Sequence, residues 1–368
     1  MSKSRDEFDR GITCQTYPGI PLGFDVESNS IMRALSRRRF LASLTRLAGF
    51  AGFASLPLLP ACGASRSRPF AVAAHAWPGY EPMFIASRQG WLDDKQVRLV
   101  ETPSATSTLQ ALTSGIVDAG ALTLDEVLRA RAQGLALSVV LVFDESAGAD
   151  MLLTQPGIET LAQLKGRRVA VEQGGLGALV LAQALQSAGL FAADVQPVSL
   201  APVDQWLAWK NGEIDAAVTY PPYARRLLEA GAHRVFDSRQ IPHAIVDVLA
   251  VRCESLEPHT PALRQLIAVY LRALSFMNQQ FAEAAKLMEP RLQLPVQDLP
   301  QLFEGLKLPT LTENHRLLSG HAPLLEPAAR QLSQNMLKIG LLPRESPLEG
   351  LVRGDFLPLL KGNGLAPA

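Results

Sequence analysis

Four carboxylates stand at positions where a side chain can act on a small molecule, because each lies beside an apolar run that predicts a buried strand or at the start of a predicted helix. They are Asp125, Asp144, Glu172 and Asp247. A carboxylate that faces a cavity at such a place can bind a cation or a hydroxyl group. The alternative is that each caps a helix or forms a solvated salt bridge, and spacing alone leaves both interpretations open.

Turns rich in hydroxyl groups or glycine supply the opposite chemistry, because bare amide groups at a helix N-terminus favour anions. One such turn spans residues 104–107 and another spans residues 174–177. For residues 104–107 an ordinary helix cap is the competing explanation. The candidate ligand-binding residues in these turns, and at the start of the helix that follows residue 122, are Ser104, Thr106, Ser107, Thr123, Gly174 and Gly175. A zwitterion, or a neutral ring that bears an amine, would satisfy both the amides and the carboxylates.

Several other kinds of chemistry have no residues to carry them. The cysteines, at positions 14, 62 and 253, form no CxxC pair, and the histidines are scattered without an HExxH motif, so we expect no metal site. QGGLG at 173–177 matches neither a phosphate-binding loop nor a dinucleotide motif, and we expect no cofactor. Lys+Arg and Asp+Glu both number 35, which argues against binding to nucleic acid.

Two similar stretches indicate which elements position these side chains. Residues 111–123 read ALTSGIVDAGALT and residues 208–220 read AWKNGEIDAAVTY. In each, a helix is expected to end on the glycine, Gly115 or Gly212, and a short buried strand is expected to follow the aspartate. The competing interpretation is that Gly-x-x-Asp-Ala is a common turn sequence in any α/β protein and that the repetition carries no further meaning. If the repetition is meaningful, it predicts two parallel sheets covered by helices.

Two series of alternating strands and helices follow from Pro69 onward, and each predicts one lobe of an α/β protein. The chain is expected to cross between the lobes at Asp150–Thr154 and at Ile245–Arg252. Strand C-termini and helix N-termini of both lobes would then face a cleft beside this hinge of two crossing segments. The predicted segments are 69–152 (lobe 1, first part), 153–244 (lobe 2), 245–345 (lobe 1, second part) and 346–368 (C-terminal tail).

The first 61 residues contain the pattern of a targeting signal. SRRRFL at 36–41 precedes a short apolar stretch and a small-residue cleavage site, which is the pattern of an export signal, here 32–61. The arrangement resembles a twin-arginine signal, with Arg37 and Arg38 as the pair. We expect residues 1–31 to be an upstream extension that a mis-chosen start codon added; a pro-region is the competing interpretation.

Cys62 lies at the predicted cleavage site and resembles the acylated residue of a bacterial lipoprotein, although Pro60 departs from the residue usual before Ala61. Residues 62–68 would form a linker. We therefore expect a periplasmic or cell-envelope protein whose only membrane contact is a lipid on Cys62.

A series of motifs after the predicted export signal resembles the motifs of a known protein family. In order they are WPGYEP at 77–82, ALTSGIVDA at 111–119, D-x-S-x-G-x-D at 144–150, LKGRRV at 164–169, GEIDAAVTY at 212–220 and DSRQIP at 237–242. Together they resemble the periplasmic substrate-binding proteins of ABC importers, in the nitrate, sulfonate, taurine and thiamine-precursor group. Their order and spacing, over residues 69–290, carry the resemblance.

The resemblance implies a two-lobed type II periplasmic-binding-protein fold that closes on a small solute and delivers it to an ABC permease with its ATPase. It places Trp77 and Tyr80 at the cleft, although their rings could instead only pack the lobe. Tyr220, which follows a predicted strand, is a further candidate ligand-binding residue. We expect a monomer, and a taurine-like or thiamine-precursor-like ligand rather than nitrate.

Two alternatives come from other functional classes. Thiamine-pyrimidine synthases share the fold but rely on a cysteine-rich iron segment, which this sequence lacks. A sensor would be expected to carry a membrane span and a signalling module after the binding lobes. There is also no Gly-x-Ser-x-Gly elbow to provide a nucleophile. We therefore expect a binding protein rather than an enzyme.

Overall fold

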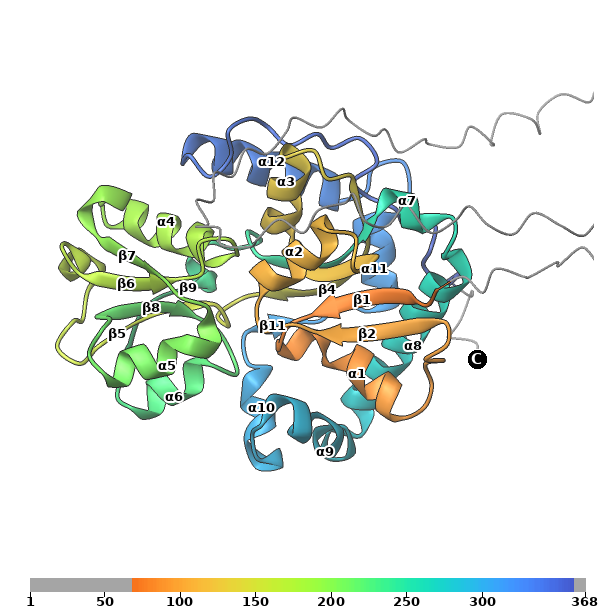
Figure 1. Ribbon diagram of the computed structural model, residues 1–368, viewed down its shortest axis with the longest axis horizontal. Coiled ribbons are helices and arrows are strands. Elements are labelled where there is room, and N and C mark those ends of the chain that lie inside the picture. The colour runs from red at the N-terminus through yellow and green to blue at the C-terminus, as the bar shows by residue number, and fades with distance from the viewer. Residues whose placement is uncertain (1–67, 361–368) are drawn as a thin grey trace, which may run out of the picture. The chain divides into compact units, whose positions relative to one another are not determined.

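Two β-sheets form the framework of residues 68–360, the part of the chain that the computed structural model describes (Figure 1). The predicted extension, export signal and acylated Cys62 lie outside these residues. The first sheet has six strands in the order β11-β4-β10-β3-β1-β2 and the second has five in the order β7-β6-β8-β5-β9. We call the first sheet with its helices the first lobe, and the second sheet with its helices the second lobe.

The first sheet is mixed. Strand β1 pairs in parallel with β2 and β3, whereas β10 runs antiparallel between β3 and β4. Strands β1 and β3 are buried throughout, as expected for strands covered by helices on both faces. The strands are β1 Phe70–Ala74, β2 Val97–Glu101, β3 Ala119–Thr123, β4 Leu137–Ser146, β10 Val246–Arg252 and β11 Leu306–Lys307.

The second sheet repeats the parallel arrangement. Strand β6 pairs in parallel with β7 and β8, and β5 runs antiparallel between β8 and β9. The strands are β5 Met151–Thr154, β6 Arg168–Val171, β7 Gln196–Ser199, β8 Ala216–Thr219 and β9 His233–Asp237. Since all of them lie between Met151 and Asp237, the chain enters and leaves this sheet once each.

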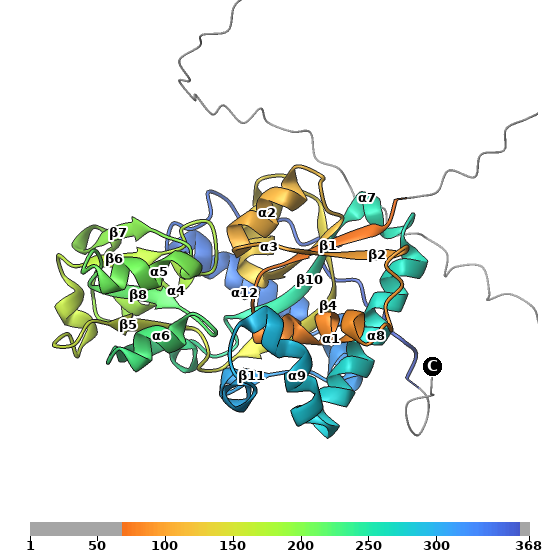
Figure 2. The same ribbon diagram turned by 60° about the horizontal axis from the view of Figure 1, so that its bottom comes forward.

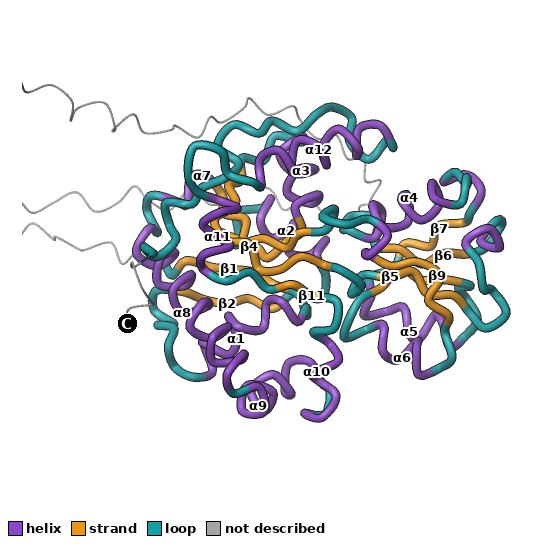
Figure 3. The backbone as a smooth tube through the Cα atoms, turned by 180° about the vertical axis from the view of Figure 1, so that it is seen from behind, coloured by secondary structure: helices purple, strands orange, loops and turns teal. Residues whose placement is uncertain are grey.

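Helices cover both faces of each sheet, as Figures 1 and 3 show from opposite sides. In the second lobe α4 lies over one face, and α5 and α6 lie over the other. In the first lobe α2 and α3 lie opposite α1 and α8. The helices are α1 Glu81–Arg88, α2 Ala105–Thr113, α3 Leu124–Ala132, α4 Gly177–Ser187, α5 Pro202–Lys210, α6 Ala224–Glu229, α7 Cys253–Leu256, α8 Thr260–Gln279, α9 Phe281–Leu292, α10 Leu299–Leu302, α11 Leu311–Leu318 and α12 Leu325–Lys338.

The two similar stretches form the same local structure. Helices α2 and α5 are each followed by a glycine with positive φ, 72° at Gly115 and 68° at Gly212. The left-handed conformation suits glycine because a Cβ would be crowded there. Strand β3 or β8 then begins one residue after an aspartate, Asp118 or Asp215. Each aspartate accepts a hydrogen bond from a backbone amide of a neighbouring parallel strand. Asp118 accepts from Ala71 N of β1 at 2.9 Å, and Asp215 accepts from Arg168 N of β6 at 2.8 Å.

The crossings differ in detail from the prediction. The expected crossing segments 150–154 and 245–252 contain strands β5 and β10, and each of these strands lies within a single sheet. The connections themselves are residues 147–150 and 238–245, which adjoin one another: the hydroxyls of Ser146 and Ser238 lie 2.8 Å apart, and Gly148 N donates to Ser238 Oγ at 2.6 Å. Tertiary pairing, rather than local propensity, decides which sheet takes each strand.

The end of the described chain returns to the first lobe. Within the predicted tail, Leu351, Phe356 and Leu357 are buried, and Val352 forms a bridge to Val139 of β4. Figure 2 shows α9 on the first lobe and α12, which packs on α3, at the side of that lobe next to α4. In residues 68–360 we find no helix whose length and hydropathy would let it cross a membrane.

Candidate functional site

A small cavity lies where the two lobes meet. Its volume is about 20 Å³, and both lobes line it. Among the residues chosen from the sequence, the lining includes Trp77, Thr123, Glu172, Tyr220 and Asp247. Such a volume holds about one water molecule. Admission of a solute therefore requires the lobes to separate.

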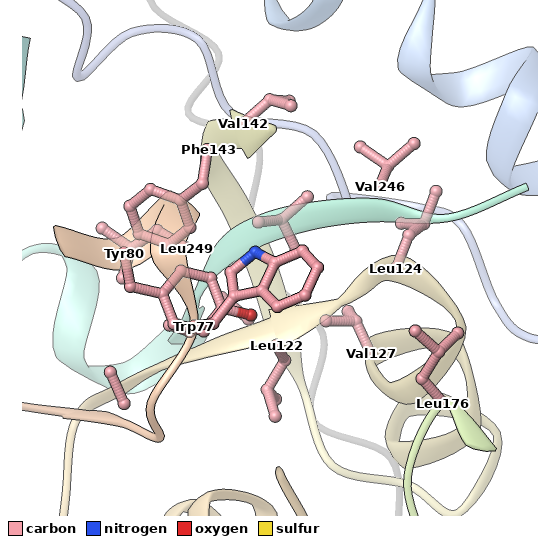
Figure 4. Close-up of a cluster of buried hydrophobic side chains, with 14 of the residues drawn as sticks. Trp77, Tyr80, Leu122, Leu124, Val127, Val142, Phe143, Leu176, Val246 and Leu249 are labelled. Atoms are coloured by element: carbon pink, nitrogen blue, oxygen red, sulfur yellow. The ribbon is translucent and has the colours of Figure 1, made fainter. Parts of the chain in front are cut away.

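The segment after β1 brings the first aromatic rings to this region. Trp77 is 3% exposed and donates from Nε1 to Asp144 Oδ2 at 2.9 Å, and the buried Tyr80 donates its hydroxyl to Asp247 Oδ1. A Cβ at Gly79 would lie 1.8 Å from Asp144 Oδ2, so only glycine allows this approach. Figure 4 shows Trp77 and Tyr80 within the buried cluster that also contains Phe143. The rings therefore do pack the lobe, and they also bind its acids.

Three candidate residues form a row across the first sheet. In the strand register Asp247 of β10 is opposite Thr123 of β3 on one side and Asp144 of β4 on the other. Burial raises the pKa of Asp144 to about 8, and repulsion from Asp150 acts in the same direction, while the Trp77 hydrogen bond opposes the shift. Burial and then repulsion from Asp144 hold the pKa of Asp247 well above its usual range.

The start of α3 carries two further acids. Thr123 donates to Asp125 Oδ1 at 2.6 Å, and Asp125 also pairs with Arg129 at 3.3 Å. Glu126 Oε2 accepts from Thr123 N at 2.9 Å, which closes a capping box. Burial, followed by repulsion from Asp125, raises the pKa of Glu126 to about 8. Asp125 is thus held by the Thr123 hydroxyl and the Arg129 guanidinium, whereas Glu126 caps α3 and also lines the cavity.

Each lobe places a carboxylate on a helix N-terminus of the other. Glu172, in the turn after β6, accepts from Thr106 N in the first turn of α2 at 2.8 Å. Glu126, on α3, accepts at 2.9 Å from the amide of Leu176, the residue before α4. Arg129 adds a third bond between the lobes, to Gly174 O at 2.9 Å. These exchanges hold the lobes together because helix N-termini favour anions.

The remaining predicted residues take supporting positions. Ser104 caps α2 by accepting from Ser107 N at 3.3 Å, so the ordinary-cap interpretation accounts for both serines. Gly174 lies against Thr106, and Gly175 lies against Glu126 and Glu172. Leu176 belongs to the same buried cluster as Leu124 and Val127 of α3, and Figure 4 shows these three.

Sequence inspection missed three polar residues that line the cavity, His75, Glu126 and Asp150. His75 lies just after β1, and burial lowers its pKa to about 3, so its ring is neutral at pH 7. Glu126 completes the Thr-x-x-Glu pattern of a capping box, a signal that predicts only a cap. Asp150 was visible as the last residue of the D-x-S-x-G-x-D motif at 144–150.

Several polar atoms around the cavity are buried without a hydrogen-bond partner. They include one oxygen each of Asp144, Asp150 and Asp247, together with His75 Nδ1 and the hydroxyl of Tyr220. The Tyr220 ring lies edge-on to Trp77 at 5.5 Å and tilted to His75 at 5.8 Å. Unpaired buried polar groups are costly, so a cluster of them marks a place where a ligand or water can pair. The described residues contain no cluster of His, Cys, Asp and Glu that could hold a metal ion.

Comparison with known proteins gives consistent results. A model described as the NMT1-like family matches residues 63–289, which is more than half of the 368 residues. A putative aliphatic sulfonates-binding protein of Escherichia coli (strain K12) is 29% identical over 242 residues, which are 61% of this chain and 76% of the relative. The taurine-binding periplasmic protein of the same organism is 29% identical over 164 residues, 44% of this chain and 51% of the relative.

A solved structure supports the architecture. The alkanesulfonate-binding protein SsuA from Xanthomonas axonopodis pv. citri, bound to MOPS, superposes with a TM-score of 0.64 at 19% identity, over 76% of this chain and 96% of that chain. At this identity the likeness concerns the fold alone. It confirms the predicted α/β architecture of a two-lobed type II periplasmic binding protein.

Proposed function

Because the chain belongs to the NMT1-like family, we propose that it is the solute-binding component of an ABC importer. It captures a small organic solute of the taurine/sulfonate or thiamine-pyrimidine-precursor kind and delivers it to a permease driven by an ATPase. The observation that carries the proposal is the polar cavity lined by both lobes next to the two connections between them. The relatives named above are described as binding proteins, so we propose binding rather than catalysis.

The mechanism follows from the contacts between the lobes. Residues 69–146 and 246–360 act as one body and residues 151–237 as the other, and they move about the connections 147–150 and 238–245. Opening breaks the bonds from Thr106 N to Glu172, from Leu176 N to Glu126 and from Arg129 to Gly174 O. Closure on a solute then re-forms the contact between the lobes, with the solute in place of part of it.

The solute would meet a mixed surface. Trp77 and Tyr220 offer ring faces and edges, and Thr123, Glu172 and Asp247 offer polar atoms from both lobes. Ser104, Thr106, Ser107, Asp125, Asp144, Gly174, Gly175 and Tyr80 contribute by holding these groups or the turns that carry them. The protein acts in the periplasm or cell envelope, in line with its periplasmic taurine-binding relative.

Titration calorimetry of the exported chain with taurine, an alkanesulfonate and an aminopyrimidine tests the proposal. We expect saturable binding of at least one of these solutes. Tyr220→Ala should weaken it about tenfold, because a buried aromatic contact contributes roughly 1 kcal/mol beyond burial. Phe191→Ala, a change at a ring that is 75% exposed, is the matched control and should leave the affinity unchanged. Failure of all three solutes to bind would contradict the proposed function.

A further inference from the structure

We propose that the cleft selects a solute through a protonated amine or amidine, which the carboxylates of Asp144, Asp150 and Asp247 bind together. This inference rests on the proposed function and names the chemical group that the same cleft requires. An anionic group on the solute would be optional. The inference goes beyond the names of the relatives, which mention sulfonates and taurine.

The first support is the set of unpaired acceptors. Asp144 and Asp247 each use one oxygen, for Trp77 Nε1 and for the Tyr80 hydroxyl, while Asp144 Oδ1 and Asp247 Oδ2 are buried without a partner. Asp150 Oδ2 is also buried and unpaired. Three carboxylates from β4, β10 and the first connection thus present free oxygens in one region. These carboxylate oxygens can only accept hydrogen bonds, so they need donors. An ammonium or amidinium group supplies several N–H donors.

The second support is the charge balance. Among residues 68–360, no ion pair joins Asp144, Asp150 or Asp247 to a lysine or arginine within 4.0 Å. Arg129 pairs with Asp125 and with Gly174 O, and Arg291 pairs with Glu81 and Glu101. Buried carboxylates are stable only when they are paired or protonated. A cationic solute would give these three acids the partner that the chain does not provide.

The third support concerns the places where an anion would bind. Glu172 occupies the N-terminus of α2, and Glu126 occupies the amide that precedes α4. An anionic solute would have to displace one of these carboxylates and would then lie near the other acids. A cationic solute meets no such competitor, since His75 is neutral at pH 7 because burial lowers its pKa.

The rings favour the same class of solute. The Tyr220 ring lies 5.5 Å from the Trp77 ring and 5.8 Å from the His75 ring, centroid to centroid. Cations are attracted to the faces of Trp and Tyr, most strongly where water is excluded. A planar amidinium or aminoheterocycle would use both the ring contacts and the carboxylate oxygens.

Binding of a cation should release protons. At neutral pH, burial raises the pKa of Asp144 to about 8 and that of Asp150 to about 7, so part of this cluster is protonated in the absence of solute. A bound cation favours the ionised forms, so its affinity should fall as the pH is lowered below about 7. The titratable and charged groups that face the cluster from the surrounding elements are Tyr80, Asp125, Glu126, Arg129, Glu172, Tyr220, Tyr270 and His75.

The test uses matched probes. Taurine and isethionate share a sulfonate on a two-carbon chain and differ in that one carries an ammonium and the other a hydroxyl; 4-aminopyridine carries a protonated ring and no anion. The full exported chain is titrated with each by calorimetry, at pH 6 and pH 8 and in two buffers of different ionisation enthalpy. We expect 4-aminopyridine and taurine to bind, with isethionate about tenfold to a hundredfold weaker, as for loss of a charge-assisted hydrogen bond. Proton release at pH 7 should accompany binding of 4-aminopyridine.

Two variants sharpen the result. Asp247→Asn should weaken 4-aminopyridine about tenfold or more and reduce the proton release. Asp355→Asn, at a surface pair with Arg353, should change neither quantity. Isethionate or nitrate binding with no response to amines would overturn the inference and leave the proposed function standing. Failure of every probe would overturn the proposed function and the inference with it.

Discussion

The two similar helix–turn–strand units share a scaffold and differ where their strands end. Both place a glycine of positive φ before an aspartate that binds the lobe's first parallel strand. Strand β3 then leads through Thr123 into the acids of α3, whereas β8 leads through Thr219 into Tyr220. The repeated positions are therefore structural, and the residues just after each repeat supply the chemistry. One lobe delivers mainly carboxylates to the cleft and the other delivers a ring and a carboxylate.

The largest expected loss of stability comes from adding a side chain at a tightly packed glycine within the first lobe, and it is compared with the same change at a glycine between the lobes. Gly79→Ala places a Cβ 1.8 Å from Asp144 Oδ2 and 2.9 Å from Trp77 Nε1. We expect a loss of about 3 kcal/mol in the free energy of unfolding, from overpacking and a broken hydrogen bond. Urea denaturation measures it.

Gly174→Ala is the counterpart between the lobes. Its Cβ would lie 2.6 Å from Thr106 Oγ1, a side chain of the other lobe. The lobes can relieve this contact by opening, so we expect less than about 1 kcal/mol of destabilisation. Equal losses in the two variants would mean that the lobes are not separate bodies.

The next effect compares the two anchoring aspartates. Asp118 is fully buried and accepts from Ala71 N, Arg68 and Ser255, while the side chain of Asp215 is 21% exposed and accepts from Arg168. We expect Asp118→Ala to cost about 2 to 3 kcal/mol and Asp215→Ala about 1 kcal/mol, because exposed pairs contribute less. Urea denaturation measures the free energy of unfolding of both variants. A larger loss for Asp215→Ala than for Asp118→Ala would contradict this comparison.

The pH dependence tests the acids of the first lobe. The pKa values of Glu126 and Asp144 are raised to about 8 and that of Asp150 to about 7, so above pH 6.5 the folded state binds protons that the unfolded state has lost. The free energy of unfolding should therefore decrease from pH 6.5 to pH 8, by about 2 kcal/mol for this coupled group. Lowered pKa values, such as that of His75, act below this window.

Asp144→Asn should flatten this pH dependence, because it removes one titrating group, whereas Asp215→Asn should leave it unchanged. Stability that rises with pH over the same interval would show that the acids are ionised in the folded protein. Thermal unfolding in a series of buffers measures the slope.

The smallest effects compare the two tyrosines. Tyr80→Phe removes a donor to Asp247 and should cost about 1 kcal/mol. Tyr220→Phe removes a hydroxyl that is buried without a partner, so the free energy of unfolding should stay the same or rise by up to about 1 kcal/mol. A greater loss for Tyr220→Phe would indicate that its hydroxyl has a partner in the solution state.

Much of the fold could be predicted because its signals are local. Gly115 and Gly212 end helices for a reason that their own backbone conformations show, and apolar runs such as 70–74 form buried strands. The position of the crossings was predicted less well, because β5 and β10 acquire their sheet only through pairing with distant strands.

The site was predicted only in part, because some of its residues have local sequence signals and others depend on contacts between distant strands. Glu172, Tyr220 and Asp247 were chosen from their places beside predicted strands and Trp77 from the family resemblance, and all four line the cavity. The pairing of Asp247 with Asp144 depends on strand register, which no local pattern reveals. Glu126 was missed because its capping motif explains one oxygen, and only the folded chain shows that the other binds Leu176.

The central claim is that two bodies close on a cationic solute, and the distance between them tests it most directly. Non-natural amino acids carrying spin labels at Gln110 on α2 and Gln186 on α4, both exposed, would report that distance without using the native cysteines. We predict a broad distribution of distances that includes open forms without solute, and a single narrow distribution when 4-aminopyridine is bound. One unchanged narrow distance in both samples, under conditions where calorimetry shows binding, would contradict the account.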